Sequence, residues 1–179
     1  MKNTAFTRKM VALLLVTVLI LSASATAYAD YTPLSNEWKT RVSSFTRVSI
    51  THSPTSGCVK VLQRFLSCYN NTSRSYIYNA GGVDGIFGQG TDNAVRAFQT
   101  ARYIGVDGDC GSTTWGEIAD CIFKTYWVSV GADLFMTNDQ CPYGAECDVM
   151  YVHINSPYSY SYYTFDYYGN SLGFAFQTT

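Results

Sequence analysis

The stretch VDGIFGQGTDNAVRAFQ, residues 83–99, places an Asp-Gly turn, a second glycine and a threonine directly before a helical pattern of apolar residues. A near copy, VDGDCGSTTW, follows at residues 106–115. Asp accepts backbone N–H groups in tight turns, and Gly tolerates the positive φ that such turns need. Thr91 and Thr114 are predicted to be the N-caps of the helices that follow. The repeated pattern D-G-x-x-G-x-x-T is therefore interpreted as a unit that begins a helix.

The chain around these turns has helical periodicity. Apolar residues recur with a spacing of three and four in residues 61–66, 94–101 and 115–122. This pattern predicts three short helices between residues 58 and 123. The preceding segment, 30–57, is rich in Ser and Thr, and its loose alternation in RVSSFTRVSIT (41–51) predicts a strand.

The C-terminal third has a different composition. Residues 126–179 contain no Lys or Arg, five acidic residues and nine tyrosines. Alternation in TYWVSV (125–130) and VMYVHI (149–154), followed by the strand-forming run YSYSYYTFDYY, predicts a small antiparallel β unit. Gly169-Asn170 is typical of a two-residue hairpin turn, and Cys141 and Cys147 are predicted to close another turn.

The N-terminus is predicted to be a secretory signal. Basic residues precede a short apolar run, and Ala27-Tyr28-Ala29 fits a cleavage site before Asp30. Cleavage removes three of 12 basic residues and none of 13 acidic ones, so the mature charge is 9 minus 13, or −4. This charge argues against nucleic acid and basic membrane-surface binding. The mature protein is expected to be extracellular or associated with the cell wall, without a membrane partner.

The helical part resembles the three-helix peptidoglycan-binding domain of bacterial cell-wall hydrolases. The anchors of that family occur here in order: Leu62-Gln63, D-G-x-F-G-x-x-T at 84–91, A-V-x-x-F-Q at 94–99, and D-G-x-x-G-x-x-T-W at 107–115. Two departures are a long segment, NNTSRSYIYNAGG (70–82), and a cysteine at position 110. With this resemblance the expected fold is α+β, a small three-helix bundle followed by a small antiparallel β unit. The expected organisation is a signal peptide, an N-terminal arm, the three-helix domain and a tyrosine-rich β region, at residues 1–29, 30–57, 58–123 and 124–179.

The resemblance implies peptidoglycan, as glycan strand or peptide stem, as the partner. The candidate contacts are polar and aromatic side chains near the expected groove: Gln63, Asp84, Phe87, Arg96, Gln99, Tyr103, Asp107 and Trp115. Each has a structural alternative. Large aromatics dominate the packing of small bundles, so Phe87 and Trp115 also suit the core. Gln63 and Gln99 also suit hydrogen bonds to the loop backbone.

The cysteines are expected to form disulfides. Their number is even, they follow a predicted signal peptide, and no C-x₂-C pair suggests a metal site; they are Cys58, Cys68, Cys110, Cys121, Cys141 and Cys147. The fold that the resemblance implies puts Cys58 and Cys68 about 15 Å apart on one helix, too far for a disulfide. If four cysteines join the first and third helices, two patterns remain open. One pairs 58–110 with 68–121, and the other pairs 58–121 with 68–110.

No catalytic site, metal or cofactor is expected. The mature chain has only His52 and His153, without H-E-x-x-H, and an even cysteine count leaves no predicted free thiol. The G-x-S-x-G match at 169–173 is read as a hairpin, because only eight residues follow Ser171 and none is Asp, Glu or His.

The leading hypothesis is thus a secreted, non-catalytic module that binds peptidoglycan. The first alternative is a carbohydrate-binding or adhesive protein that uses the tyrosine-rich β region. There, Tyr160, Tyr162 and Tyr168 share one face of a strand and Tyr163 and Tyr167 the other. A simpler role for these tyrosines is to cover the helices. The second alternative is an accessory protein of a wall hydrolase.

Overall fold

The structure is a computed structural model. It describes residues 32–128, 133–138, 148–156, 159–165 and 171–178. The predicted signal peptide, Cys141, Cys147 and the Gly169-Asn170 turn lie outside these residues. Tyr31–Thr179 forms a compact unit. In its described part no helix is long and apolar enough to cross a membrane.

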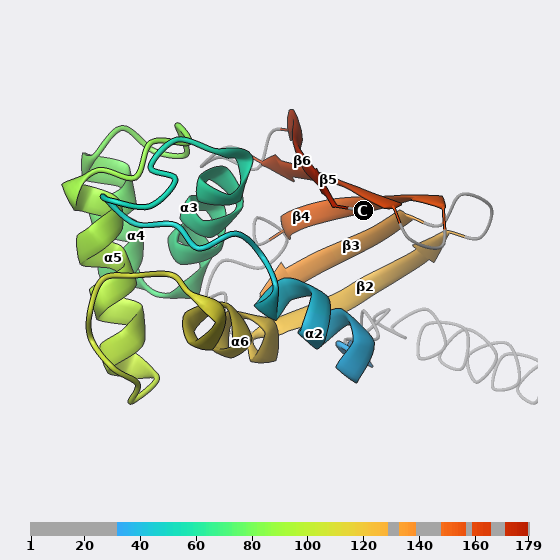
Figure 1. The fold of residues 1–179 in the computed structure, drawn as a ribbon, viewed down its shortest axis with the longest axis horizontal. Helices are drawn as coiled ribbons and strands as arrows, with labels where there is room; N and C mark the ends of the chain where they lie inside the picture. The colour runs from blue at the N-terminus through green and yellow to red at the C-terminus, as the bar shows by residue number, and fades with distance from the viewer. Residues whose placement is uncertain (1–31, 129–132, 139–147, 157–158, 166–170, 179) are drawn as a thin grey trace, which may run out of the picture. The chain divides into compact units, whose positions relative to one another are not determined.

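Most of the strands follow the helices in the chain, which makes the fold α+β as predicted (Figure 1). The helices are α2 (Asn36–Ser43), α3 (Gly57–Tyr69), α4 (Asn71–Asn79), α5 (Gln89–Ala101) and α6 (Ser112–Asp120). The strands are β1 (Thr32–Pro33), β2 (Ile122–Val128), β3 (Asp133–Asn138), β4 (Asp148–Ser156), β5 (Ser159–Phe165) and β6 (Ser171–Thr178). All neighbouring strands are antiparallel, in the order β1-β2-β3-β4-β5-β6.

The strand predicted at residues 41–51 is wrong. Helix α2 occupies Asn36–Ser43, and the rest of that segment contributes only an isolated bridge at Val48. The helix has its own local signals: the Ser35 hydroxyl accepts a hydrogen bond from the Trp38 N–H, and Arg41 pairs with Glu37 one turn away. These capping and charge signals, together with burial of Val42, outweigh a weak alternation.

The prediction of three helices between residues 58 and 123 missed a fourth. The long segment 70–82 contains α4, which is capped by the Asn70 side chain accepting from the Ser73 N–H at 2.9 Å. Ser73 and Ile77 are buried, and the Ser73 hydroxyl donates to the Ala94 carbonyl of α5. The two buried residues, four apart, are too few to give a visible helical stripe in the sequence.

One core joins the helices to the sheet. Phe45, from the loop after α2, makes edge-to-face contacts with Trp115 of α6, Tyr162 of β5 and Phe176 of β6 at 4.9 to 5.2 Å between ring centroids. Tyr160 is also buried, against Trp38 at 5.5 Å. The described tyrosines on this face of β5 therefore cover the helices, which is the simpler of the two roles considered above.

Candidate functional site

Two turns of the same design lie between the helices of the bundle. The first turn unit, Asp84–Thr91, leads into α5, and the second turn unit, Asp107–Thr114, leads into α6. Each turn accepts a glutamine side chain from a 13-residue helix that lies before it in the chain. Gln63 of α3 enters the first unit and Gln99 of α5 enters the second.

In the first turn unit, the Gln63 amide satisfies the loop from inside. Its Nε2 donates to Asp84 Oδ1 at 2.8 Å, to the Ile86 carbonyl at 3.0 Å and to Thr91 Oγ1 at 3.1 Å. Its Oε1 accepts from the Gly85 N–H at 2.8 Å. Because Gln63 is only 2% exposed, these bonds replace the water that the loop would otherwise need.

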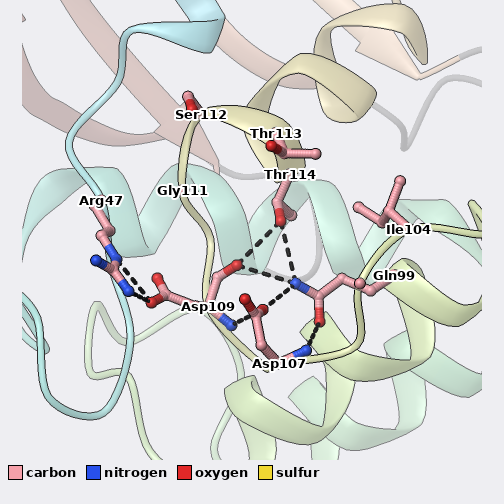
Figure 2. A pocket seen from close by; sticks show the side chains of 10 residues that line it. Arg47, Gln99, Ile104, Asp107, Asp109, Gly111, Ser112, Thr113 and Thr114 are labelled. Atoms are coloured by element: carbon pink, nitrogen blue, oxygen red, sulfur yellow. Dashed lines mark hydrogen bonds and ion pairs between the residues drawn. The ribbon is translucent and has the colours of Figure 1, made fainter.

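The second turn unit repeats this network, as Figure 2 shows. Gln99 Nε2 donates to Asp107 Oδ1 at 2.7 Å, to the Asp109 carbonyl at 3.0 Å and to Thr114 Oγ1 at 3.2 Å. Here Oε1 accepts from two backbone groups, the N–H of Asp107 at 3.1 Å and that of Gly108 at 2.9 Å. Both glutamines thus hold a turn in shape, which is the structural alternative considered for them above.

The threonines of the pattern are not N-caps, so that prediction is wrong. The N-caps are Gly88 and Gly111, neither of which makes a side-chain capping bond. Thr91 and Thr114 lie three residues further on and are buried at 1% and 3% exposure. Their hydroxyls complete the glutamine network instead, since each accepts from a glutamine Nε2 and donates to a loop carbonyl.

An open cleft of about 380 Å³ lies over the second turn unit (Figure 2). Its lining comes from the loop after α5, the turn itself, the start of α6 and the N-terminal arm: Arg47, Gln99, Ile104, Gly105, Asp107, Asp109, Gly111, Ser112, Thr113 and Thr114. Carboxylates, hydroxyls and a guanidinium therefore surround the opening. Such a lining suits a polar ligand that carries both hydrogen-bond donors and acceptors.

An ion pair closes one side of the cleft. Arg47 Nε donates to Asp109 Oδ2 at 2.7 Å, and the Arg47 Nη2 contacts the same oxygen. The other carboxylate oxygen, Oδ1, is buried and has no hydrogen-bond partner. An unsatisfied buried acceptor is costly and calls for an explanation. Because this oxygen is buried, a ligand in the cleft does not reach it in this conformation.

Hydrogen bonds in the cleft favour the charged forms of Asp107 and Arg47. The pKa of Asp107 is lowered, chiefly because its carboxylate accepts the backbone N–H of Asp109, with a further contribution from Gln99. The hydrogen bond to Asp109 raises the pKa of Arg47. The cleft therefore offers ligand groups fixed negative charge beside a cation that is itself 57% exposed.

The structure separates the predicted contact residues into three groups. Gln99 and Asp107 line the cleft, and Tyr103, beside the lining residue Ile104, is 97% exposed with a positive φ of 57°. Phe87 and Trp115 are buried in the core at 2% and 0% exposure, where no ligand reaches them. The remaining three, Gln63, Asp84 and Arg96, serve the turns.

Arg96 supports the second turn unit from outside. It pairs with Asp92 at 2.8 Å and donates to the carbonyls of Val106 and Asp107. The two side chains lie over Gly108, whose φ is +72°. In the described structure Arg96 therefore fixes the turn.

Several cleft residues were missed from the sequence, namely Arg47, Ile104, Asp109, Ser112 and Thr113. Asp109 could have been found, because it is the one charged residue between the two glycines of the second turn unit. Arg47 lies 62 positions from Asp109, so no local pattern connects them.

Comparison with protein families gives one match. Residues 55–118 match the model of the family described as "Putative peptidoglycan binding domain". This match agrees with the resemblance seen in the sequence. Searches of curated proteins and of solved structures find no significant match. Within the described residues, no group of three or more His, Cys, Asp or Glu side chains could hold a metal ion.

Proposed function

We propose that the chain is a secreted, non-catalytic module that binds peptidoglycan in the cleft over the second turn unit. The family match supports peptidoglycan as the partner. The observation that carries the position of the site is the open polar cleft over the second turn unit, lined by Arg47, Asp107 and the hydroxyls of Ser112 and Thr113. Secretion rests on the signal pattern in residues 1–29.

The cleft chemistry fits this polymer. Sugar hydroxyls and the amides of the peptide stem can donate hydrogen bonds to the exposed carboxylate of Asp107. Stem carboxylates can accept from Arg47, Ser112 and Thr113 at the same opening. Tyr103 precedes the lining residue Ile104 in the chain, and its exposed ring is available to pack against a sugar face.

Tyr103 has a positive φ because it directly follows the C-cap residue of α5 and ends the helix in a left-handed conformation. A bulky residue with φ of 57° is an outlier that the surrounding structure must hold in place. Here the chain is fixed on both sides, because the Tyr103 N–H donates to the Thr100 carbonyl and the Ile104 N–H donates to the Gln99 carbonyl. Since the side chain itself is 97% exposed, packing does not explain its presence.

The described part of the tyrosine-rich region offers less support for the sugar-binding alternative. Tyr160 and Tyr162 are buried at 5% and 1% exposure. On the opposite face, Tyr151, Tyr163 and Phe174 contact one another across β4, β5 and β6, but their rings meet at 60° and 80°. Rings at such angles do not form a flat platform for a sugar.

Co-sedimentation of the full chain with purified peptidoglycan sacculi tests the proposal. We expect Asp109→Ala to weaken binding about 10- to 100-fold, since it releases Arg47, whose hydrogen bond to a ligand carboxylate contributes about 1.5–3 kcal/mol. Tyr103→Ala should weaken it by a smaller factor without changing the melting temperature, because the side chain makes no packed contact. The matched control is Ile86→Ala, which changes the exposed residue at the equivalent position of the first turn unit.

Three outcomes would contradict the proposal. The full chain could fail to pellet with sacculi, which removes the function. Ile86→Ala could reduce pelleting as much as Asp109→Ala, which removes the second turn unit as the site. Release of soluble muropeptides in the same tubes would show a catalytic activity.

A further inference from the structure

Two buried cysteines lie at the beginnings of α3 and α6. Cys58 is the second residue of α3 and is 4% exposed, and Cys110 directly precedes Gly111, the N-cap of α6, and is 0% exposed. Both are thiols in the structure and both belong to the hydrophobic core. They are 52 positions apart in the sequence, so only the fold brings their surroundings together.

One short segment of the N-terminal arm contacts both cysteines. Cys58 hydrogen-bonds to Thr46, and Cys110 forms an antiparallel bridge with Val48 through both backbone bonds, at 3.0 and 3.2 Å. Residues that exchange both bonds have Cα atoms about 5.5 Å apart. The Thr46 carbonyl also accepts from the indole N–H of Trp115, so the starts of α3 and α6 meet at this segment.

Burial and neighbouring groups raise the pKa values of both thiols. Burial raises the pKa of Cys110 well above its usual range, and Cys58 is among the further groups that raise it. Burial likewise raises the pKa of Cys58. Since the thiolate is the reactive form, both thiols become inert once the core has closed, and any reaction between them belongs to an earlier stage of folding.

We infer that Cys58 and Cys110 form a disulfide that ties the start of α3 to the second turn unit. Of the two pairings that the resemblance leaves open, this one leaves Cys68, near the end of α3, for Cys121, directly after α6. The starts of the two helices are then joined by one bond and their ends by the other. The alternative pairing would draw Cys58 away from Thr46 and towards the end of α6.

The bond forms by thiol–disulfide exchange with an external disulfide such as oxidised glutathione. The thiolate of one cysteine attacks the external disulfide, forms a mixed disulfide and releases one glutathione thiolate. The second cysteine thiolate attacks the protein sulfur of the mixed disulfide and releases the other. The two cysteines lose two electrons and two protons in total, and the two released glutathione thiols carry them. This inference does not depend on peptidoglycan binding.

Peptide mapping of the full chain, refolded from the reduced state in a glutathione redox buffer, tests the pairing. Free thiols are blocked under denaturing conditions before digestion without reductant. Trypsin alone is insufficient, because Cys110 and Cys121 share the peptide 103–124. Adding a protease that cleaves after Glu117 separates them and leaves the four cysteines on peptides 48–60, 65–74, 103–117 and 118–124.

We expect a cross-linked species of peptides 48–60 and 103–117 that disappears on reduction. The Cys68→Ser/Cys121→Ser double variant should retain it, whereas Cys58→Ser/Cys110→Ser should lose it and melt about 10 °C lower than the oxidised parent. Linkage of peptide 48–60 to 118–124, or blocked thiols on both 48–60 and 103–117, would overturn the inference. The mapping of the unmodified chain decides the matter even if a serine variant does not fold.

Discussion

The two turn units share a scaffold but differ in what they present to solvent. In both, a buried glutamine bonds an Asp carboxylate, a loop carbonyl and a threonine hydroxyl with distances that agree within about 0.1 Å. The position after the Asp-Gly pair is Ile86 in the first unit and Asp109 in the second. The hydrogen-bond network thus fixes the turn, and the residue after the Asp-Gly pair, which is outside that side-chain network, is free to differ between the units.

Both units also pair with the N-terminal arm at equivalent positions. The Phe87 N–H donates to the Pro54 carbonyl, and the Cys110 N–H donates to the Val48 carbonyl. The connection between glutamine and aspartate is nevertheless very different in length, 21 positions in the first unit and eight in the second, because α4 is inserted only in the first. The network, rather than the length of the connection, therefore determines the turn geometry.

Replacing the glutamines should have the largest effect and should distinguish the two units. Gln63→Leu leaves the buried Gly85 N–H without an acceptor, whereas Gln99→Leu removes the acceptor of two N–H groups, those of Asp107 and Gly108. An unsatisfied buried donor costs about 1–3 kcal/mol, so we expect losses of about 2 and about 3 kcal/mol respectively. Urea unfolding curves of the two variants measure this difference.

Thr100→Val is a suitable control, because its exposed hydroxyl only donates within α5. Equal losses in the two glutamine variants would mean that the second acceptor contact of Gln99 adds nothing. A loss below about 0.5 kcal/mol in either would show that water replaces the amide.

The glycines of the two units should differ in the next largest effect. Both have positive φ, but a Cβ on Gly108 would approach Asp92 Oδ1 to 2.1 Å, whereas one on Gly85 would meet only the Lys60 side chain at 3.0 Å. The left-handed conformation costs an alanine about 1–2 kcal/mol at either position. Displacement of the ion pair adds to this at the second unit, so we expect about 2 kcal/mol for Gly108→Ala and about 1 for Gly85→Ala.

Thermal unfolding checks this order. Comparing Asp92→Ala/Gly108→Ala with Asp92→Ala alone isolates most of the steric part, since Asp92→Ala removes the side chain that the new Cβ approaches most closely. If the glycine variants are equally destabilised, the backbone conformation alone decides the cost.

The sequence predicted the parts of the fold that repeat a local pattern. The apolar stripes located α3, α5 and α6, and alternation located β2 and β4. The strand-forming tyrosine run located β5 and the Gly169-Asn170 turn signal implied β6, while β1 and β3 went unnoticed. The D-G-x-x-G-x-x-T units correctly predicted where two helices begin. The role predicted for their threonines was wrong, because the glutamine that each threonine contacts lies far from it in the sequence. The contact of Arg47 with Asp109 depends on the path of the arm across the bundle, which no local spacing encodes.

The smallest effect concerns protonation of Asp107. Its pKa is lowered in the folded protein by the Asp109 N–H and by Gln99, so the charged carboxylate stabilises the fold at pH values above the unfolded pKa. This contribution is lost as the pH falls through the lowered folded pKa, that is, below about pH 4. Asp107→Asn keeps an oxygen acceptor for the same two donors but cannot ionise. Its free energy of unfolding should therefore fall less steeply than that of the parent as the medium is acidified.

Solvent screening keeps this effect small, because the Asp107 side chain is exposed. Urea unfolding at a series of pH values between neutral and strongly acidic measures the effect of protonating Asp107. Thr113→Ala is the control, because it changes a residue of the same cleft without removing a titrating group. The two turn units also differ in charge at this place. The first has uncharged Ile86 where the second has Asp109, which is paired with Arg47. If Asp107→Asn and the parent lose stability in parallel, the hydrogen bonds at the second unit hold the carboxylic acid as well as the carboxylate. The turn would then keep its shape in acid, and any loss of peptidoglycan binding at low pH would have to come from the cleft groups that contact the ligand.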